Sequence, residues 1–298
     1  MSSNPIHIIE HKSLKTSIKD ISLLLKLRLS SLVVFSALMG YLMVDHQNIV
    51  WLNLFWLMIA GTLVTGASNA LNQIFEKNPD SMMERTKDRP LPADRMNDQF
   101  ALFVAIVSGI AGILLFLKFF GPLSAFISLL ALVLYAFVYT PLKKITPFAV
   151  FVGAIPGALP PLIGWAAASD TLSYQAWILF SIQFFWQFPH FWAIAWVQHD
   201  DYKKAGFHLL PSPGGRDKAS AMQTVVYSFS LIPLSFLPFS FQMSGLIAVS
   251  IMLIAALILC YQSVQLLKTC EISSARQLMF GSFFYLPVVQ LVMVLDKI

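Results

Sequence analysis

Three oxygen-bearing side chains follow one another at helical spacing at the end of a long apolar stretch. In the segment NQIFEKNPD, Asn72, Glu76 and Asp80 stand four residues apart, which would place their oxygens along one face of a helix end. Acids at a helix C-terminus oppose the helix dipole and need a compensating cation, and such hard oxygens suit Mg²⁺. Pro79 could end the helical register before Asp80. The alternative is a solvated loop whose charges pair with one another.

A second acidic pair follows another apolar stretch. Asp200 and Asp201 lie in the segment WQFPHFWAIAWVQHDDYKKAGFHLLP, which also runs from apolar residues into adjacent acids and then into basic residues. Two acidic clusters on one side of a membrane could hold metal ions on either side of a single polyanion. The repeated pattern therefore favours a diphosphate as the ligand.

The elements that must position these clusters are apolar helices. Of the 298 residues, 57% are hydrophobic and 12% are charged, whereas about 25% are charged in a soluble domain. Long apolar runs without alternation favour membrane helices over barrel strands. Nine stretches could each cross a hydrocarbon core about 30 Å thick, at residues 29–45, 51–75, 99–118, 121–140, 147–168, 173–197, 221–240, 244–267 and 276–295. We therefore expect an all-α polytopic membrane protein with nine transmembrane helices in one bundle.

The basic residues predict the orientation of this bundle. With the N-terminus in the cytoplasm, 18 of the 20 Lys and Arg residues lie on the cytoplasmic side, and the other side keeps only Lys118 and Lys297. The positive-inside rule strongly favours this arrangement. Topology and contact with anionic lipid explain the net charge of +5, so nucleic acid is not an expected partner. The resulting divisions are a polar cytoplasmic segment, 1–28, and a membrane domain, 29–298, with cytoplasmic loops 76–98 and 198–218.

Several segments resemble a known family. NQIFEKNPD resembles the N-x-x-x-D-x-x-x-D motif of the UbiA-type intramembrane prenyltransferases, with Glu76 where aspartate is usual. Similarity to the haem branch of that family, the protohaem IX farnesyltransferases, extends over residues 20–290 and is carried by ERTKDRPLP, YTPLKKITPFAVFVGAIPGALPPLIGW, PHFWAIAWVQHDDYKKAGFHLLP and SSARQLMFGSFFYLP. Two departures stand out: residues 26–28 read KLR where the branch has KPR, and Asn78 replaces an additional aspartate.

The resemblance implies a Mg²⁺-dependent enzyme that transfers a farnesyl group from farnesyl diphosphate to a vinyl group of haem b, with addition of water, to give haem O. Metal ions would neutralise the leaving diphosphate. The implied catalytic residues are Asn72, Glu76, Asp80, Asp200 and Asp201, of which the four acids would bind the metal. The implied diphosphate ligands are Arg28, Arg85, Arg89, Lys143 and Lys144.

Histidine is the candidate ligand for haem. His190 follows Pro189 within an apolar run, where an ionisable side chain is a functional candidate. The alternative is a helix–helix hydrogen bond near the kink that Pro189 should cause. His199 borders the second acidic cluster and is a weaker candidate for contact with haem.

Other functions remain open at this point. A related prenyltransferase could act on a quinone precursor or chlorophyllide. A cation-coupled transporter would also contain broken helices and carboxylates, but it would place the carboxylates at the membrane midplane. A third alternative is a non-catalytic assembly factor for a terminal oxidase. The resemblance further implies a bacterial inner membrane, an active site on the cytoplasmic side, contact with membrane lipid, and a haem A synthase or terminal-oxidase assembly proteins as partners.

Overall fold

The computed structural model describes residues 14–44 and 50–298. Apart from an isolated bridge between Ser244 and Lys297, the regular structure of these residues is helical. Much of the predicted polar segment, residues 1–13, lies outside the described residues, as does position 45 at the end of the first apolar stretch. The remainder of the polar segment contains a helix, α1 (Leu14–Leu24).

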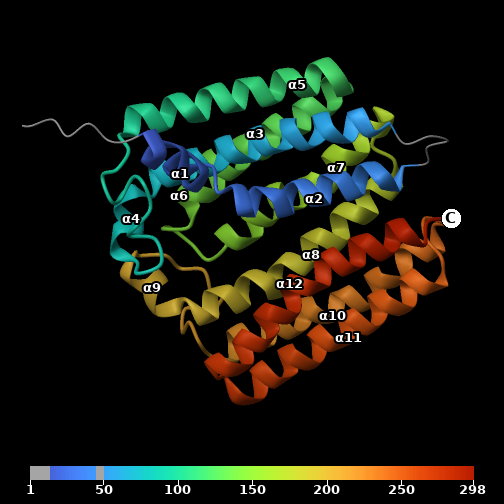
Figure 1. Ribbon diagram of the computed structural model, residues 1–298. Helices are drawn as coiled ribbons and strands as arrows, with labels where there is room; N and C mark the ends of the chain where they lie inside the picture. Colours follow the sequence, from blue (N-terminus) through green and yellow to red (C-terminus); the bar gives the residue numbers. More distant parts are fainter. Residues whose placement is uncertain (1–13, 45–49) are drawn as a thin grey trace, which may run out of the picture.

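The long helices form two groups (Figure 1). The first comprises α2 (Leu27–Met43), α3 (Trp51–Phe75), α5 (Asp98–Val133) and α7 (Ala149–Ser169). The second comprises α8 (Tyr174–Val197), α10 (Lys218–Ser240), α11 (Leu246–Thr269) and α12 (Ile272–Leu295). Four short elements lie between consecutive long helices within the groups: α4 (Lys77–Met82), the π-helix η1 (Leu134–Tyr139) and α6 (Thr140–Leu142) in the first, and α9 (His199–Lys204) in the second.

The predicted number of nine membrane helices is not confirmed. Within the described residues, six helices are long and apolar enough to cross a membrane, or seven if Ile18–Leu24 and Leu27–Met43, bent by 50°, form one span. Two predicted stretches fall within the single segment Asp98–Leu142. That segment is interrupted at Gly121, whose φ of +85° is readily adopted only by glycine. Helix α8 is not among the six.

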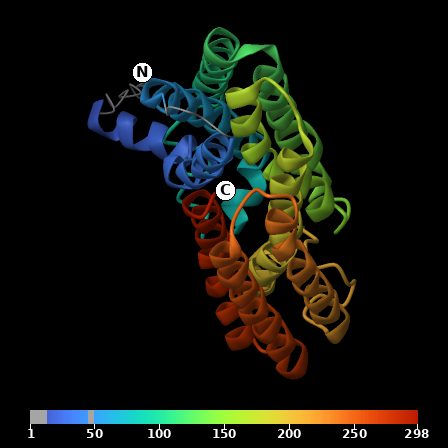
Figure 2. The same ribbon diagram turned by 90° about the vertical axis from the view of Figure 1, so that its right-hand side faces the viewer.

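Close helix contacts hold the first group together. A Cβ atom at Gly164 on α7 would lie 1.8 Å from the Ala37 carbonyl oxygen on α2, and one at Gly40 would lie 2.2 Å from the Pro161 carbonyl oxygen. Such small residues allow two helix backbones to approach closely. Helix α12 contacts both α2 and α8, so the C-terminal helix lies beside the N-terminal ones and joins the two groups (Figure 2).

The outside of the bundle is apolar. Large side chains such as Phe103 on α5, Val226 on α10 and Ile254 on α11 are exposed. An apolar surface over long apolar helices is the surface expected of a chain embedded in lipid. The chain is therefore a multi-pass membrane protein.

Both acidic segments lie at the same end of the bundle. Helices α4 and α9, which follow α3 and α8, contact each other at that end (Figure 1). Met83, Ala205 and Phe207 form a small buried apolar cluster between the two segments. The fold therefore brings together two regions that are more than one hundred residues apart in the sequence.

Candidate functional site

The backbone at the end of α3 keeps three polar residues in helical register. Helix α3 ends at Phe75, and Glu76, with φ −102° and ψ 10°, separates it from α4. The Glu76 amide nevertheless donates to the Asn72 carbonyl at 3.0 Å, and the Asp80 amide donates to the Glu76 carbonyl at 2.7 Å. Pro79 lies in the first turn of α4, where a missing N–H is tolerated. The expectation that Pro79 ends the register before Asp80 is therefore wrong.

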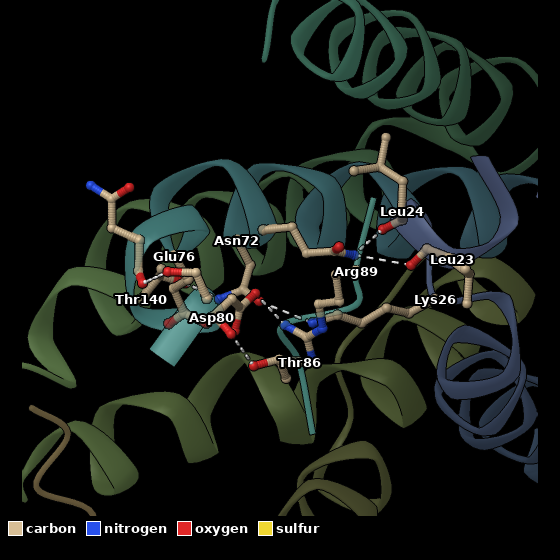
Figure 3. Close-up of polar contacts among 12 residues, drawn as sticks. Leu23, Leu24, Lys26, Asn72, Glu76, Asp80, Thr86, Arg89 and Thr140 are labelled. Atoms are coloured by element: carbon tan, nitrogen blue, oxygen red, sulfur yellow. Dashed lines mark hydrogen bonds and ion pairs between the residues drawn. The ribbon is translucent and has the colours of Figure 1, made fainter. Parts of the chain in front are cut away.

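Each of these three side chains contacts a cation, two from distant segments and one, Arg89, from the same loop. Figure 3 shows the arrangement around Asn72, Glu76 and Asp80, with Lys26 and Arg89 reaching it from other parts of the chain. The pairs are Lys26 Nζ with Asn72 Oδ1 at 3.0 Å, Arg89 Nη1 with Asp80 Oδ2 at 2.6 Å, and Lys143 with Glu76. We call these six residues the paired cluster. They supply the compensating cations that acids at a helix end require.

The acids of the paired cluster are buried. The side chain of Asp80 is only 1% exposed, and Asn72 and Glu76 are also buried. Burying a carboxylate is costly unless it is paired and hydrogen-bonded. Asp80 Oδ1 is buried and has no hydrogen-bond partner in the described part of the chain. Thr86 Oγ1 donates to the Asp80 carbonyl at 2.8 Å, which ties loop 76–98 back to the site.

The segment from η1 to α6 forms another wall of the site. Asn72 Nδ2 donates to Thr140 Oγ1 at 3.2 Å, and Thr140 Oγ1 donates to the Tyr135 carbonyl at 2.9 Å. Lys143 Nζ lies 4.9 Å from the centre of the Tyr139 ring and 5.3 Å from that of Phe207. These rings provide cation–π contacts to the buried ammonium group. A π-helix at this position agrees with the frequent occurrence of such helices at functional sites.

Lys26 was not among the predicted site residues. It has φ 47° and ψ 50° between α1 and α2, and Gln73 Nε2 holds this turn by donating to the Leu23 and Leu24 carbonyls at 3.0 and 2.7 Å. The turn directs Lys26 to Asn72, whereas the predicted Arg28 is exposed. The sequence pointed to this turn through the segment KLR, which contains both Lys26 and Arg28.

Two other predicted diphosphate ligands also lie outside the paired cluster. Arg85 and Lys144 are exposed, and in the described structure neither forms an ion pair with a cluster side chain. The structure therefore brings Arg89 and Lys143, but not Arg28, Arg85 or Lys144, to the three polar residues of α3 and α4.

The second acidic pair is closer to solvent. The side chain of Asp200 is 75% exposed and lies 3.1 Å from Arg216 Nη1. Asp201 is 17% exposed and lies 3.5 Å from Lys204 Nζ. Both acids occupy the first turn of α9, where negative charge complements the helix dipole.

Arg216 connects this second pair to the end of α8. Its Nε donates to the Trp196 carbonyl at 2.7 Å, and its Nη2 donates to the Val197 carbonyl at 3.4 Å. These are carbonyls of the last turn of α8, which lack partners within the helix. Arg216 thus fixes the position from which Asp200 extends, although nothing in the sequence distinguished it from the other basic residues.

The acids are not assembled into a metal site. In the described ranges, no group of three or more His, Cys, Asp or Glu side chains could hold a metal ion, and Glu76, Asp80, Asp200 and Asp201 are each paired with a base. The donor chemistry of the paired cluster still fits Mg²⁺. Its hard oxygens stand in one register, and the buried Asp80 Oδ1 has no hydrogen-bond partner among the described residues.

The predicted haem residues have different surroundings. His190 Nδ1 lies 2.9 Å from Ser282 Oγ on α12, and its ring stacks on Trp186 with centroids 4.5 Å apart. The helix–helix contact that was the alternative to haem binding is therefore present. His199 is half-buried and lines a cavity of about 410 Å³. Burial, followed by the nearby charge of Arg216, lowers the pKa of His199 below its ordinary value.

Comparison with known proteins identifies relatives over most of the chain. Residues 33–286 match the model of the UbiA prenyltransferase family. A protoheme IX farnesyltransferase of Cytophaga hutchinsonii is 47% identical over 276 residues, which cover 92% of this chain and 96% of that protein.

Solved structures share the fold. A digeranylgeranylglyceryl phosphate synthase matches with a TM-score of 0.79 and 19% identity, covering 95% of this chain and 99% of the other. A UbiA homologue from Archaeoglobus fulgidus, bound to GPP and Mg²⁺, matches with a TM-score of 0.65 and 14% identity, covering 92% and 99%.

Proposed function

Because this chain belongs to the UbiA prenyltransferase family and is a membrane-bound enzyme of that kind, we propose that it transfers a farnesyl group from farnesyl diphosphate to a vinyl group of haem b, with addition of water, to give haem O. The name of the Cytophaga hutchinsonii relative supports both substrates. The paired cluster is the observation that carries the proposal. It places three cations around buried polar side chains at one end of an apolar bundle.

The proposed reaction breaks the C–O bond of the donor and the π bond of the vinyl group, and it forms a C–C bond and a C–O bond at the two vinyl carbons. The C–O bond between the farnesyl group and the diphosphate breaks, and its electrons leave with the diphosphate. The vinyl group of haem b supplies the electron pair for the new C–C bond. Water captures the cation left beside the porphyrin and loses a proton, so the products are haem O, diphosphate and H⁺.

Residues of the paired cluster would bind the diphosphate. Lys26, Arg89 and Lys143 can donate N–H groups to phosphate oxygens. Arg28, Arg85 and Lys144, which are exposed here, would join them only if their segments close over the ligand.

The two acidic segments would hold the metal. Asn72, Glu76 and Asp80 would offer oxygens on one side of the diphosphate, and Asp200 and Asp201 would offer them on the other. When bound there, Mg²⁺ acts as a Lewis acid that offsets the negative charge of the leaving group. Mg²⁺ in the Archaeoglobus fulgidus homologue supports this choice of metal.

The bundle would keep the reacting carbons dry while presenting haem. An allylic cation reacts with stray water, so apolar walls are needed along the farnesyl chain. We assign His190 and His199 as contacts to haem, the first within the bundle and the second at its polar end. His190 would have to exchange its contact with Ser282 for one with the iron or a propionate.

The same proposal includes the topology. We propose nine spans, an N-terminus in the cytoplasm and an active site on the cytoplasmic side of a bacterial inner membrane. The distribution of 18 of 20 basic residues and the position of α4 and α9 at one end support this orientation. A haem A synthase, or assembly proteins of a terminal oxidase, would use the product.

Pigment extraction tests the proposed function directly. Cells that lack their own activity and express this chain should accumulate a farnesylated, hydrated haem, whereas cells expressing Asp80→Asn should not. Purified protein supplied with farnesyl diphosphate should prefer haem b to a quinone precursor or chlorophyllide. Prenylation of one of those acceptors without any farnesylated haem would replace the proposed acceptor, and unchanged haem composition in both strains would favour an assembly factor.

A further inference from the structure

A cavity of about 410 Å³ lies beside the second acidic segment. Its walls come from the end of α8, from α9 and from loop 206–215, together with Pro147 from the segment before α7. The volume falls within the range of about 300–1,000 Å³ that is typical of small-molecule sites. The α9 helix that lines it lies at the same end of the bundle as α4 (Figure 1).

The lining of the cavity combines basic and apolar groups. His199, Lys203 and His208 supply nitrogen atoms, while Tyr202 and Phe207 supply aromatic surface. None of the described residues that line the cavity is an Asp or a Glu. A cavity with N–H donors, aromatic walls and no carboxylate suits an anion attached to a flat apolar body.

The loop that closes the cavity is held in one shape. Ser212 Oγ donates to Asp217 Oδ2 at 2.5 Å, and the Ser220 amide donates to Asp217 Oδ1 at 2.8 Å. Gly215 has φ +72°, and a Cβ atom there would lie 2.7 Å from His199 Cε1. Only glycine can therefore occupy this position without displacing the histidine ring, so this wall of the cavity depends on Gly215.

The cavity and the paired cluster share a wall. The Phe207 ring lines the cavity, and its centre lies 5.3 Å from Nζ of Lys143, which pairs with Glu76. The His208 amide also donates to the Lys143 carbonyl at 3.2 Å. A molecule in the cavity would thus lie next to the residues proposed to bind the diphosphate, on the other side of one phenyl ring.

From this juxtaposition we propose that the cavity binds the carboxylate side chains of the tetrapyrrole acceptor, with Lys203 and His208 as the N–H donors. The inference rests on the proposed function, which makes a dicarboxylic porphyrin the second substrate. It adds a subsite that anchors the polar edge of the acceptor while its apolar edge extends toward the farnesyl group. Lys203 and His208 are binding residues here and take no part in the chemistry.

Esterification of the acceptor tests this assignment. The dissociation constants of haem b and of its dimethyl ester are measured by absorbance titration without farnesyl diphosphate, for the wild type and for Lys203→Gln/His208→Gln. The wild type should bind haem b at least about tenfold more tightly than the ester, the effect of losing one hydrogen bond to a charged group. The double variant should bind both ligands equally, and its KM for farnesyl diphosphate should stay within twofold of the wild-type value.

Two control variants separate charge from folding. Lys203→Arg keeps the cation and should preserve the preference for haem b. Lys218→Gln removes an exposed cation at the start of α10, outside the cavity lining, and should behave as the wild type. Both residues of the double variant are exposed, so their substitution should leave thermal unfolding unchanged.

The outcomes also separate this inference from the proposed function. If the wild type produces no farnesylated haem, the proposed function fails and the inference fails with it. If the wild type produces it but binds the ester as tightly as haem b, the inference alone is overturned. A preference for haem b that persists in the double variant also overturns it, as would be found if the cavity held an anionic lipid headgroup.

Discussion

Substitution of Arg89 should destabilise the protein through the carboxylate that it leaves behind. Arg89 Nη1 lies 2.6 Å from Asp80 Oδ2, and the two side chains are 20% and 1% exposed. Breaking a buried ion pair by removing one partner costs about 3–5 kcal/mol. Because Arg89 retains some contact with solvent, we expect Arg89→Gln to lower the free energy of unfolding by about 3 kcal/mol, which corresponds to a fall in Tm of about 5 °C for a chain of this length.

Two further variants test whether burial and charge are the causes. Adding Asp80→Asn to Arg89→Gln removes the unpaired charge and should restore most of the lost stability. Lys87→Gln breaks an ion pair with Glu84 in the same loop, where the side chains are 47% and 70% exposed. Exposed pairs contribute about 0–1 kcal/mol, so this variant should change Tm by less than about 2 °C.

Magnesium should compensate for the missing guanidinium. If Asp80 binds Mg²⁺, the ion can neutralise the carboxylate that Arg89→Gln leaves unpaired. A metal concentration one hundred times its dissociation constant stabilises the folded state by about 2.7 kcal/mol, nearly the whole expected loss. Thermal unfolding of the detergent-solubilised protein, with Mg²⁺ or with EDTA, measures this effect. A Tm for Arg89→Gln within 1 °C of the wild type, or an equal response of both proteins to Mg²⁺, would refute the reasoning.

Three other predictions concern the substrates and the topology. Asp80→Ala should abolish turnover and weaken binding of farnesyl diphosphate in the presence of Mg²⁺ by at least tenfold, measured by calorimetry, while haem titrations stay unchanged. His190→Ala should weaken haem binding and spare farnesyl diphosphate. Ser282→Ala, which removes the hydroxyl that contacts His190 and the Met279 carbonyl, should leave haem affinity intact; an equal loss in both variants would indicate packing. Cysteines at positions Ser81 and Ser212 should react with a membrane-impermeant reagent only from the cytoplasmic side, and labelling from the periplasm would reverse the topology.

The sequence was informative about the acids because their spacing is local. The interval of four residues between Asn72, Glu76 and Asp80 is preserved by backbone hydrogen bonds across the break at Glu76. Arg89 lies in the same loop as Asp80, but Lys26 and Lys143 come from distant segments and leave no such pattern. Lys26 is 46 positions from Asn72, so its role depends on how helices pack and not on local sequence.

The turn before α2 shows why the sequence could not predict which of Lys26 and Arg28 contacts the cluster. Lys26 adopts a left-handed conformation. Glycine and asparagine are the residues that usually predict this conformation, and neither occupies this position. Gln73 stabilises the turn through the Leu23 and Leu24 carbonyls, a contact across 50 and 49 positions that only the folded chain reveals. Selecting Arg28 from the same KLR segment followed the family pattern, and the structure places the neighbouring lysine at the cluster.

The apolar stretches were a better guide to helices than to membrane spans. The predicted boundary between the stretches 99–118 and 121–140 coincides with the break at Gly121, which Pro122 follows. Helix α8 contains Gln183 and Gln187, whose side chains donate to the Gly157 and Ala154 carbonyls of α7. Polar residues whose hydrogen bonds are made inside a bundle lower the hydropathy of a helix without exposing it to water. This explains why α8 is less apolar than the six membrane-capable helices although it packs within the bundle.

Paired acids and bases at one buried site are suited to a ligand that carries both a metal and phosphates. In the structure, Asp80 and Glu76 neutralise Arg89 and Lys143, whereas Lys26 contacts the neutral amide of Asn72, so two of the three cations are compensated before substrate binds. A magnesium diphosphate offers cations to the acids and anions to the bases, and each protein group can exchange one charged partner for another. Such an exchange limits the desolvation cost that an isolated buried charge would impose. A site built from bases alone would bind a diphosphate but would have to bury uncompensated positive charge while empty. The apparent competition between ion pairing and metal binding therefore fits the proposed chemistry, and the response of Arg89→Gln to Mg²⁺ measures it directly.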